Sequence, residues 1–215
     1  MTAGPTWEPI DEVRYLGNRS SGRMGLEIAQ ATSEAGCLTT LLRGPGTQGP
    51  ESNLENLTQK RFQTAHDLEK ILRDQWPHHD VLIMAAAVAD FRPQLEKSPP
   101  RKIRRSDGSL TLNLESVPDI LAQLAAEDPP GRIRIGFALE PQDTLMDSAV
   151  EKLHRKSLSG IIANPISTLD SEMIDATFVL ANGQTERAAP GPVSKREFAR
   201  WLAQRVISLL KTNQS

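Results

Sequence analysis

The sequence predicts an α/β fold in which helices cover both faces of a mainly parallel β-sheet. The run from Val81 to Ala87 is continuously apolar, as is typical of a strand that is buried on both faces. Segments with the apolar periodicity of a helix alternate along the chain with short apolar segments. Such alternation favours parallel strands that are joined by helices on the outside of the sheet.

The elements follow in order from apolar periodicity and from start and stop signals. Gly36, directly after the first helical pattern, is one such stop signal. The expected helices span residues 21–35, 65–73, 118–127, 144–156 and 194–210. The expected strands span residues 38–42, 61–63, 81–87, 132–139, 160–163 and 176–181, of which 61–63 has the weakest pattern. Together they predict a three-layer Rossmann-like sandwich that forms a single domain over residues 1–215.

A different pattern between residues 95 and 115 interrupts this series. It contains two prolines and the basic run from Arg101 to Arg105, followed by a Ser-Asp-Gly sequence at 106–108. Leucines then alternate with polar residues up to Leu114. Asp-Gly between two extended segments is a strong hairpin signal. We therefore expect a β-hairpin flap over about residues 95–115 that protrudes from the sandwich.

The composition excludes several classes of protein. The 215 residues include 25 basic and 27 acidic side chains, and the net charge of -2 gives no positive field of the kind that binds nucleic acid. The longest apolar stretch, Val81 to Ala89, is too short to span a bilayer, and no signal segment opens the chain. We therefore expect a cytoplasmic protein with no membrane contact. The single cysteine, Cys37, excludes an intrachain disulfide and a cysteine-based zinc cluster.

The stretch from Gly17 to Gly25 is the first candidate site. Small residues allow the backbone to approach a ligand here, and the helix that follows offers free N–H groups and the positive end of its dipole. These features favour phosphate, and the alternative is a simple helix start that is capped by Ser20 or Ser21. The stretch is not a Walker A loop and is a poor dinucleotide fingerprint, so only Arg43, after the next strand, leaves a weak case for NADP.

Two further candidates lie later in the chain. Asp90 directly follows the apolar strand, where a carboxylate can contact a base, a ribose or a metal ion. The alternative is a turn in which Asp90 accepts hydrogen bonds from nearby backbone amides. The cluster from Arg101 to Arg105 can close over a polyphosphate as a lid, or it can be a solvated charged surface.

A series of short motifs then identifies a resemblance. The motifs are Thr2-Ala3-Gly4-Pro5-Thr6, Glu8-Pro9-Ile10-Asp11, Val13-Arg14-Tyr15, Asn18-Arg19-Ser20-Ser21-Gly22, Met24-Gly25, Ala85-Ala86-Ala87-Val88-Ala89-Asp90, Lys102-Ile103-Arg104, Pro118-Asp119-Ile120, Gly136-Phe137-Ala138 and Ala163-Asn164. Each motif alone is weak, whereas the whole series in register is highly specific. In these motifs the chain resembles the phosphopantothenoylcysteine synthetase family. It is similar to the synthetase half of the bifunctional bacterial members, standing without the flavin-dependent decarboxylase half.

The resemblance implies a ligase of coenzyme A biosynthesis. The carboxylate of 4'-phosphopantothenate attacks the α-phosphorus of a nucleoside triphosphate, which gives an acyl-nucleotide and pyrophosphate, and the amine of cysteine then displaces the nucleotide. In bacterial members the nucleotide is usually CTP with Mg²⁺, while eukaryotic members use ATP, so CTP is favoured here. The alternatives are a non-catalytic paralogue that binds a nucleotide or metabolite and, more remotely, an NADP-dependent oxidoreductase.

The resemblance also assigns roles to residues. It implies that Asn18 handles the acyl-nucleotide intermediate and that Lys102 on the flap helps to form it. It implies nucleotide and phosphate contacts at Ser20, Ser21, Gly22, Met24, Ala86, Ala87, Asp90, Phe91 and Phe137. It implies no particular metal ligand. Members are dimers in which the flap contributes to the partner, so we expect a homodimer.

The sequence departs from the family pattern in three regions. Ser116-Val117 stands where members commonly have Lys-Asn, and Pro165 stands where they have Asp. The first change removes a cation and an amide near the expected nucleotide, and the second puts a ring in place of a carboxylate; Val117 and Pro165 together motivate the non-catalytic alternative. Members also carry an apolar central strand immediately before the segment that matches Thr2-Ala3-Gly4. We expect either a truncated start or another segment in that position.

Overall fold

The computed structural model describes residues 1–47, 54–94, 101–104, 108–128 and 131–213. Its central sheet has two parts. In one part, β4 (Thr39–Arg43) pairs in parallel with β1 (Thr2–Ala3) and with β5 (Leu57–Arg61). The short β1 is adjacent to the second part, to which the isolated parallel bridges Thr2–Met84 and Pro5–Ala87 connect it.

The second part of the sheet continues from that connection. Its order is β6 (Val81–Ile83), β9 (Ile133–Glu140), β10 (Gly160–Pro165), β12 (Thr177–Leu180) and β13 (Thr185–Glu186). The strands β6, β9 and β10 are parallel, whereas β12 and β13 pair in the antiparallel direction. The prediction of a mainly parallel sheet is therefore confirmed.

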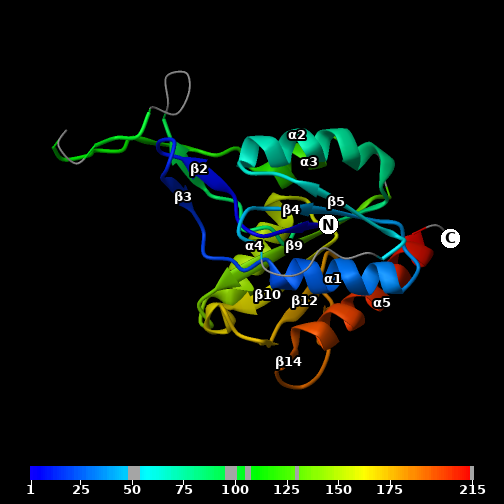
Figure 1. Ribbon diagram of the computed structural model, residues 1–215. Coiled ribbons are helices and arrows are strands. Elements are labelled where there is room, and N and C mark those ends of the chain that lie inside the picture. Colours follow the sequence, from blue (N-terminus) through cyan, green and yellow to red (C-terminus); the bar gives the residue numbers. More distant parts are fainter. Residues whose placement is uncertain (48–53, 95–100, 105–107, 129–130, 214–215) are drawn as a thin grey trace.

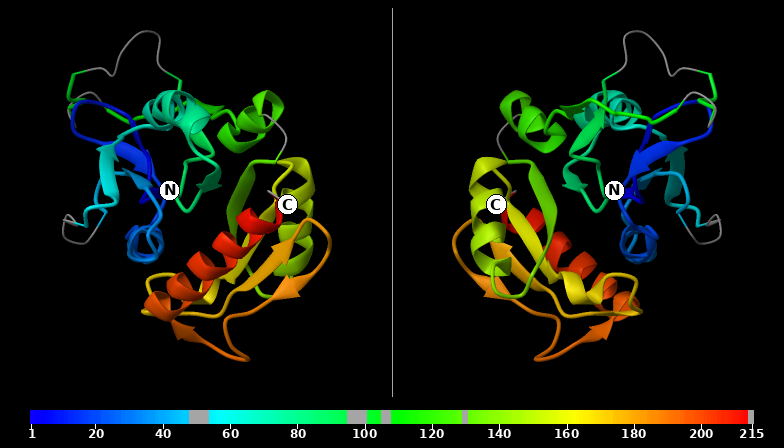
Figure 2. Two further views of the ribbon diagram at one scale, coloured as in Figure 1. Left: turned by 90° about the vertical axis from the view of Figure 1, so that its right-hand side faces the viewer. Right: turned by 90° about the vertical axis from the view of Figure 1, so that its left-hand side faces the viewer.

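Helices cover both faces of this sheet, as Figures 1 and 2 show. Side chains of α1 (Arg23–Glu34) and α5 (Lys195–Asn213) share one apolar core with one face of the sheet. Side chains of α2 (Ala65–Gln75), α3 (Ile120–Glu127) and α4 (Leu145–Arg155) share a second core with the other face. Neighbouring strand residues divide between the cores: Ile161 lies in the second and Ile162 in the first, because successive strand side chains point to opposite faces. The three-layer prediction is confirmed.

Two expected strands have different limits. The prediction of a strand at 61–63 is wrong, because the parallel ladder with β4 runs over Leu57–Arg61 and Phe62 follows it with its ring buried in the core. Most residues of this strand at the edge of the sheet are polar, so it lacks the apolar pattern by which a strand is predicted from sequence. The strand expected over 81–87 ends its continuous ladder at Ile83, and the isolated bridges of Met84 and Ala87 continue the pairing with the start of the chain.

Two small hairpins stand at one end of the sandwich. The first pairs β2 (Trp7–Pro9) with β3 (Tyr15–Gly17), and the rings of Trp7 and Tyr15 stack with centroids 3.9 Å apart. The second pairs β7 (Phe91–Pro93) with β8 (Leu114–Ser116) and forms the base of the expected flap. We call residues 101–104 and 108–113, which extend from this base in Figure 1, the arm.

The arm differs from a regular hairpin. Its described residues have no strand structure, although the Gln94 N–H still donates to the Asn113 carbonyl next to β7 and β8. Residues 95–100 and 105–107, including the expected turn residue Asp107, lie outside the described residues.

The remaining elements are short. They are the 3-10 turns η1 (Trp76–His78) and η3 (Ile166–Thr168) and the antiparallel pair β11 (Met173–Ile174) and β14 (Val193–Ser194). Among the described residues, no helix combines the length and the apolar character that crossing a membrane requires.

Candidate functional site

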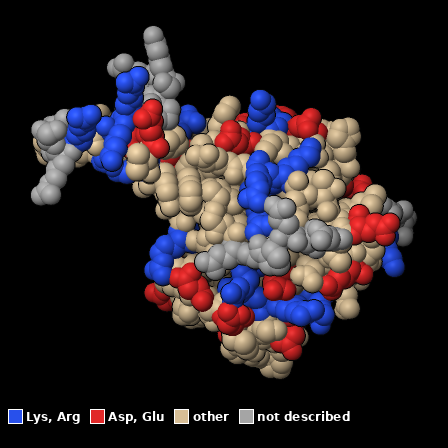
Figure 3. Space-filling model, in the orientation of Figure 1, with Lys and Arg blue, Asp and Glu red and all other residues tan. Residues whose placement is uncertain are grey.

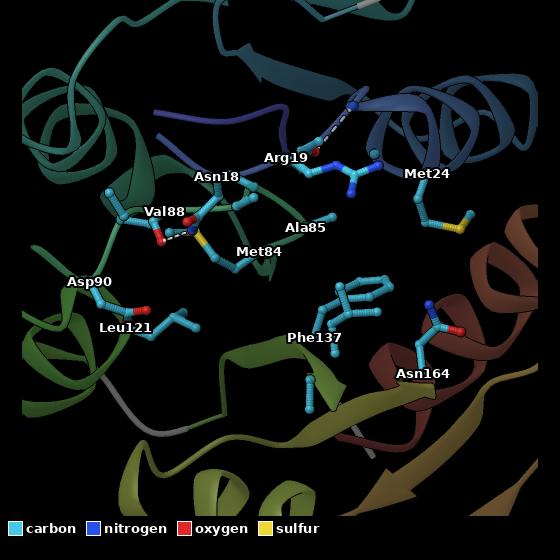
Figure 4. A pocket seen from close by; sticks show the side chains of 18 of the residues that line it. Asn18, Arg19, Met24, Met84, Ala85, Val88, Asp90, Leu121, Phe137 and Asn164 are labelled. Carbon is cyan, nitrogen blue, oxygen red and sulfur yellow. Dashed lines mark hydrogen bonds between the residues drawn. The ribbon is translucent and has the colours of Figure 1, made fainter. Parts of the chain in front are cut away.

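A pocket of about 820 Å³ opens where the carboxyl ends of β6, β9 and β10 face the start of α1. Figure 4 looks into it: Asn18 and Met24 lie on one wall, Phe137 and Asn164 lie across from them, and Asp90 and Leu121 lie at one end. Ligands of open parallel sheets bind at this edge. The position of the pocket therefore follows from the topology of the sheet.

The start of α1 forms the first wall. Gly22 is the N-cap residue, with φ of 69° in the left-handed region, and it supplies no side-chain cap. A Cβ at this position would lie 2.5 Å from Cγ2 of Thr47, so the loop needs glycine here. The alternative in which Ser20 or Ser21 is the N-cap residue is wrong. The Ser21 hydroxyl accepts only a 3.5 Å hydrogen bond from the N–H of Arg23.

This geometry leaves the first turn of α1 open to a ligand. Within the described residues, the N–H groups of Met24 and Gly25 have no backbone or side-chain acceptor. Both residues line the pocket. Unpaired amides and the positive end of the helix dipole together form a binding position for an anion such as phosphate.

Two polar side chains come from loops beside this wall. The Nδ2 of Asn18 donates to the Val88 carbonyl oxygen at 2.9 Å, which ties the loop before α1 to the loop after β6 (Figure 4). Asn18 retains a second amide hydrogen for a ligand. The exposed Asp90 carboxylate accepts no hydrogen bond from a described residue, so the alternative of a turn held by this side chain is not found.

Cations lie on opposite walls of the pocket. Arg19 and Arg23 belong to the α1 wall, where Arg19 pairs with Asp170 at 2.5 Å and Arg23 pairs with Glu172. Lys195, at the start of α5, lines the same side. Burial, followed by the neighbouring Arg23 charge, lowers the pKa of Lys195 below its usual range. Added negative charge from a ligand would relieve this repulsion.

Helix α4 supplies the cations of the opposite wall. Lys152 and Arg155 line the pocket from the last turn of this helix, and Lys156 lines it as the C-cap residue. Lys152 pairs with Glu140, and Lys156 pairs with Asp119 at 3.1 Å. A negatively charged ligand can therefore be contacted from both sides.

Phe137 and Asn164 form the remaining wall. Phe137 comes from β9 and Asn164 from β10, which are adjacent parallel strands. The Oδ1 of Asn164 is buried and has no hydrogen-bond donor among the described residues. A buried acceptor without a partner costs free energy unless a ligand or water supplies a donor.

The pocket brings together most of the candidate residues from the sequence. The candidates from the sequence that line the pocket are Asn18, Ser20, Ser21, Gly22, Met24, Ala86, Ala87, Asp90 and Phe137. Phe91 and Lys102 do not line it: Phe91 lies in β7 with half of its surface exposed, and Lys102 lies on the arm. Arg43 is also outside the pocket, and its guanidinium donates to the Thr47 carbonyl within its own loop.

Some pocket residues were missed in the sequence. Lys152 and Lys156 are four residues apart in an expected helix and hence share a face, which is the signal that could have indicated them. Lys195 and Asp170 carry no such signal, because only the return of the chain after residue 165 brings them to the start of α1.

Comparisons with known proteins identify a family model and two curated relatives that are similar to this chain. The family model described as DNA/pantothenate metabolism flavoprotein C-terminal domain matches residues 1–210. The chain is 38% identical over 166 residues to a cysteine/cysteine sulfinic acid decarboxylase of an unidentified prokaryote, covering 77% of this chain and 45% of that protein. It is 36% identical over 167 residues to the coenzyme A biosynthesis bifunctional protein CoaBC of Vibrio cholerae, covering 78% of this chain and 41% of that protein.

A solved structure extends the similarity to the fold. The C-terminal domain of a coenzyme A biosynthesis bifunctional protein CoaBC aligns with a TM-score of 0.79 and 30% sequence identity, covering 98% of this chain and 94% of that chain. The chain spans less than half the length of the two curated relatives.

Proposed function

The chain belongs to the family of the DNA/pantothenate metabolism flavoprotein C-terminal domain, and from this membership we propose that it is a ligase that joins 4'-phosphopantothenate to cysteine. The name of the Vibrio cholerae relative, a coenzyme A biosynthesis protein, supports this pathway. The proposal treats residues 1–215 as one synthetase domain, which the match over residues 1–210 supports.

The proposed reaction has two steps. A carboxylate oxygen of 4'-phosphopantothenate attacks the α-phosphorus of a nucleoside triphosphate, and the bond to the β-phosphate oxygen breaks to release pyrophosphate. The amine of cysteine then attacks the acyl carbon, loses a proton and displaces the nucleoside monophosphate. Both steps depend mainly on orientation and on stabilisation of negative charge.

The observation that carries this proposal is the open start of α1 between two groups of cations. The unpaired N–H groups of Met24 and Gly25 fit a phosphate, and Lys152 and Lys156 face them from α4. The second amide hydrogen of Asn18 is available to an oxyanion at the acyl carbon. This combination suits a polyphosphate that reacts with a carboxylate.

We propose that the base of the nucleotide contacts Phe137 and Asn164. The unpaired Oδ1 of Asn164 fits an amino group as donor, and both cytosine and adenine carry one. CTP remains our first choice and ATP the second, as the resemblance to bacterial members suggests.

Magnesium fits this pocket only together with the phosphates of the nucleotide. No group of three or more His, Cys, Asp or Glu side chains in the described part of the chain could hold a metal ion. Mg²⁺ commonly uses one or two carboxylates plus phosphate oxygens, and the pocket carboxylate Asp90 makes no ion pair with any residue that the structure describes. Bound Mg²⁺ would neutralise phosphate charge.

We further propose a homodimer in which Lys102 acts in the pocket of the second subunit. Lys102 does not line the pocket of its own chain, and the arm projects away from the body of the molecule with exposed cations (Figure 3). Leu110, Leu112 and Leu114 on or beside the arm are exposed apolar side chains, as is Phe91 in β7. Burial of these side chains against a second copy would favour association.

The test is an assay of the purified protein with 4'-phosphopantothenate, cysteine, Mg²⁺ and either CTP or ATP. We expect pyrophosphate release that requires 4'-phosphopantothenate, faster with CTP, and an amide product of the expected mass. If folded protein binds the nucleotide but releases no pyrophosphate, the ligase proposal fails. The non-catalytic alternative, motivated by Val117 at the pocket and by Pro165, would then take its place.

A further inference from the structure

The carboxylate of Asp11 connects two parts of the chain that are far apart in sequence. Asp11 lies in the turn between β2 and β3, and only 3% of its surface is exposed. Its Oδ1 accepts hydrogen bonds from the N–H groups of Val13 at 2.8 Å and Arg14 at 2.7 Å. Its Oδ2 accepts one from the N–H of Ile103 at 3.1 Å, and Ile103 belongs to the arm.

Arg14 binds the carbonyl oxygen of Ile103, the other backbone polar group of this arm residue. Its guanidinium donates to the carbonyl oxygen of Ile103, and one of its nitrogens lies 3.3 Å from Oδ2 of Asp11. Both backbone polar groups of Ile103 are thus bonded to the β2–β3 turn. Two bonds to one residue restrict both its position and the direction of the chain.

The charge state of Asp11 is consistent with this arrangement. Burial favours the neutral acid, but the N–H groups of Val13, Arg14 and Ile103, followed by the Arg14 charge, outweigh it and lower the pKa of Asp11. The carboxylate is therefore ionised at neutral pH, when both of its oxygens can accept hydrogen bonds. The neighbouring Glu12 is exposed and makes no such bond among the described residues.

We propose that Asp11 and Arg14 form a clamp on Ile103 that orients the arm and so positions Lys102, the preceding residue. Asp11 is in this sense a positioning residue. The effect on catalysis rests on the proposed function, in which Lys102 reaches a second subunit's pocket. The clamp itself does not, because it is a property of the free protein.

The first experiment measures the clamp without any substrate. Asp11→Asn preserves the size of the side chain but leaves one oxygen for three N–H donors. We expect the local turn to keep this oxygen and the distant Ile103 to lose its acceptor, so that the Ile103 amide exchanges with deuterium about tenfold faster. The matched control is Glu12→Gln, which removes a neighbouring charge and should leave exchange unchanged. Unchanged exchange in Asp11→Asn would overturn the clamp.

The second experiment measures what the clamp does for catalysis. We expect Asp11→Asn to lower kcat for pyrophosphate release toward the value of Lys102→Gln, with little change in KM for the nucleotide. Ile103→Pro, which removes the N–H donor and leaves Asp11 intact, should act alike. Ile103→Ala retains the N–H, so its kcat shows how much of the loss comes from removal of the side chain alone.

A double variant separates positioning from general damage. If Asp11 acts through Lys102, Asp11→Asn should cause no further loss in a Lys102→Gln background. If the fold-losses in kcat of the two single variants multiply in the double variant, the two residues act independently and the positioning role is overturned. If the wild-type protein releases no pyrophosphate, the proposed function fails, whereas the exchange of the Ile103 amide still decides on the clamp.

Discussion

At the residue scale, Gly25 decides how closely α1 approaches the sheet. A Cβ at this position would lie 2.6 Å from Cβ of Ala3 and 2.7 Å from the carbonyl oxygen of Thr2. Both contacts are with β1, whose backbone cannot move without disturbing its pairing with β4. The absence of a side chain thus fixes the distance between β1 and the helix start that faces the pocket.

We therefore expect Gly25→Ala to destabilise the protein, although alanine is the better helix former. The clash should reduce the free energy of unfolding by about 1–3 kcal/mol. It should also lower the proposed ligase activity, because the N–H groups of the first turn must shift. Urea unfolding followed by circular dichroism measures the first effect, and pyrophosphate release measures the second.

Gly191→Ala is the matched control for this substitution. A Cβ at Gly191 would meet nothing within 4 Å, and its φ is outside the left-handed region. Its unfolding free energy should change by no more than about 0.5 kcal/mol. Equal urea midpoints for the two variants would show that the approach of α1 to β1 is not limited at Gly25.

The residue scale also shows what the sequence could reveal about the pocket. The stretch from Asn18 to Gly25 is continuous, so its small residues and the helix after them indicate an anion site directly. Asn164 and Lys195 lie far along the chain: Asn164 was indicated only as part of the Ala163-Asn164 motif of the resemblance, and no pattern beside Lys195 indicates a ligand. Only the fold brings them to the start of α1.

At the element scale, the interior of the sandwich could be predicted, whereas one of the two hairpins at its end could not. The helix at 21–35 and the strand at 160–163 have strong apolar patterns and appear as α1 and β10. The β2–β3 hairpin was missed, because its short strands contain Glu8 and Pro9 and rely on contacts with distant parts of the chain. Glu8 is an example: it accepts a hydrogen bond from the N–H of Ala65, at the start of α2.

Helix α4 presents its cations to the pocket in a way that can be tested. Lys152 and Lys156 are one turn apart, and both line the wall opposite α1. If they contact the phosphates of the nucleotide, Lys152→Gln and Lys156→Gln should each raise KM for the nucleotide about tenfold, the loss expected for one charge-assisted hydrogen bond. Initial rates of pyrophosphate release at varied nucleotide concentration measure this effect.

Lys70→Gln is the control for these two substitutions. Lys70 is exposed on α2 and does not line the pocket, so removal of its charge should leave KM unchanged. A similar increase in all three variants would indicate a general effect of net charge. No increase in the α4 variants would remove α4 from the nucleotide site.

At the scale of the whole molecule, the pocket and the arm are separate features of one chain. The pocket lies inside the sandwich, at the carboxyl ends of the parallel strands, while the arm extends beyond the β2–β3 hairpin (Figure 1). Under the proposed function, in which Asn18 and Lys102 both act, the reaction would use residues of two chains. In a twofold dimer, each pocket would receive the arm of the other subunit.

This arrangement predicts that two variants of low activity restore activity when they form a mixed dimer. Asn18→Asp removes the amide at the pocket, and Lys102→Gln removes the cation of the arm, so each homodimer should retain only a small residual activity. In a mixed dimer, the pocket of the Lys102→Gln chain keeps Asn18 and receives an intact Lys102 from the other chain. Each mixed dimer has one complete site of two, so the isolated mixed dimer should show about half of the wild-type activity, and the unfractionated mixture, in which random pairing makes half of the dimers mixed, about a quarter. Coexpression with two different affinity tags isolates the mixed dimer, and pyrophosphate release measures its activity. If Lys102 acts in the pocket of its own chain, no chain in the mixed dimer has both residues, and the activity stays at the level of the single variants.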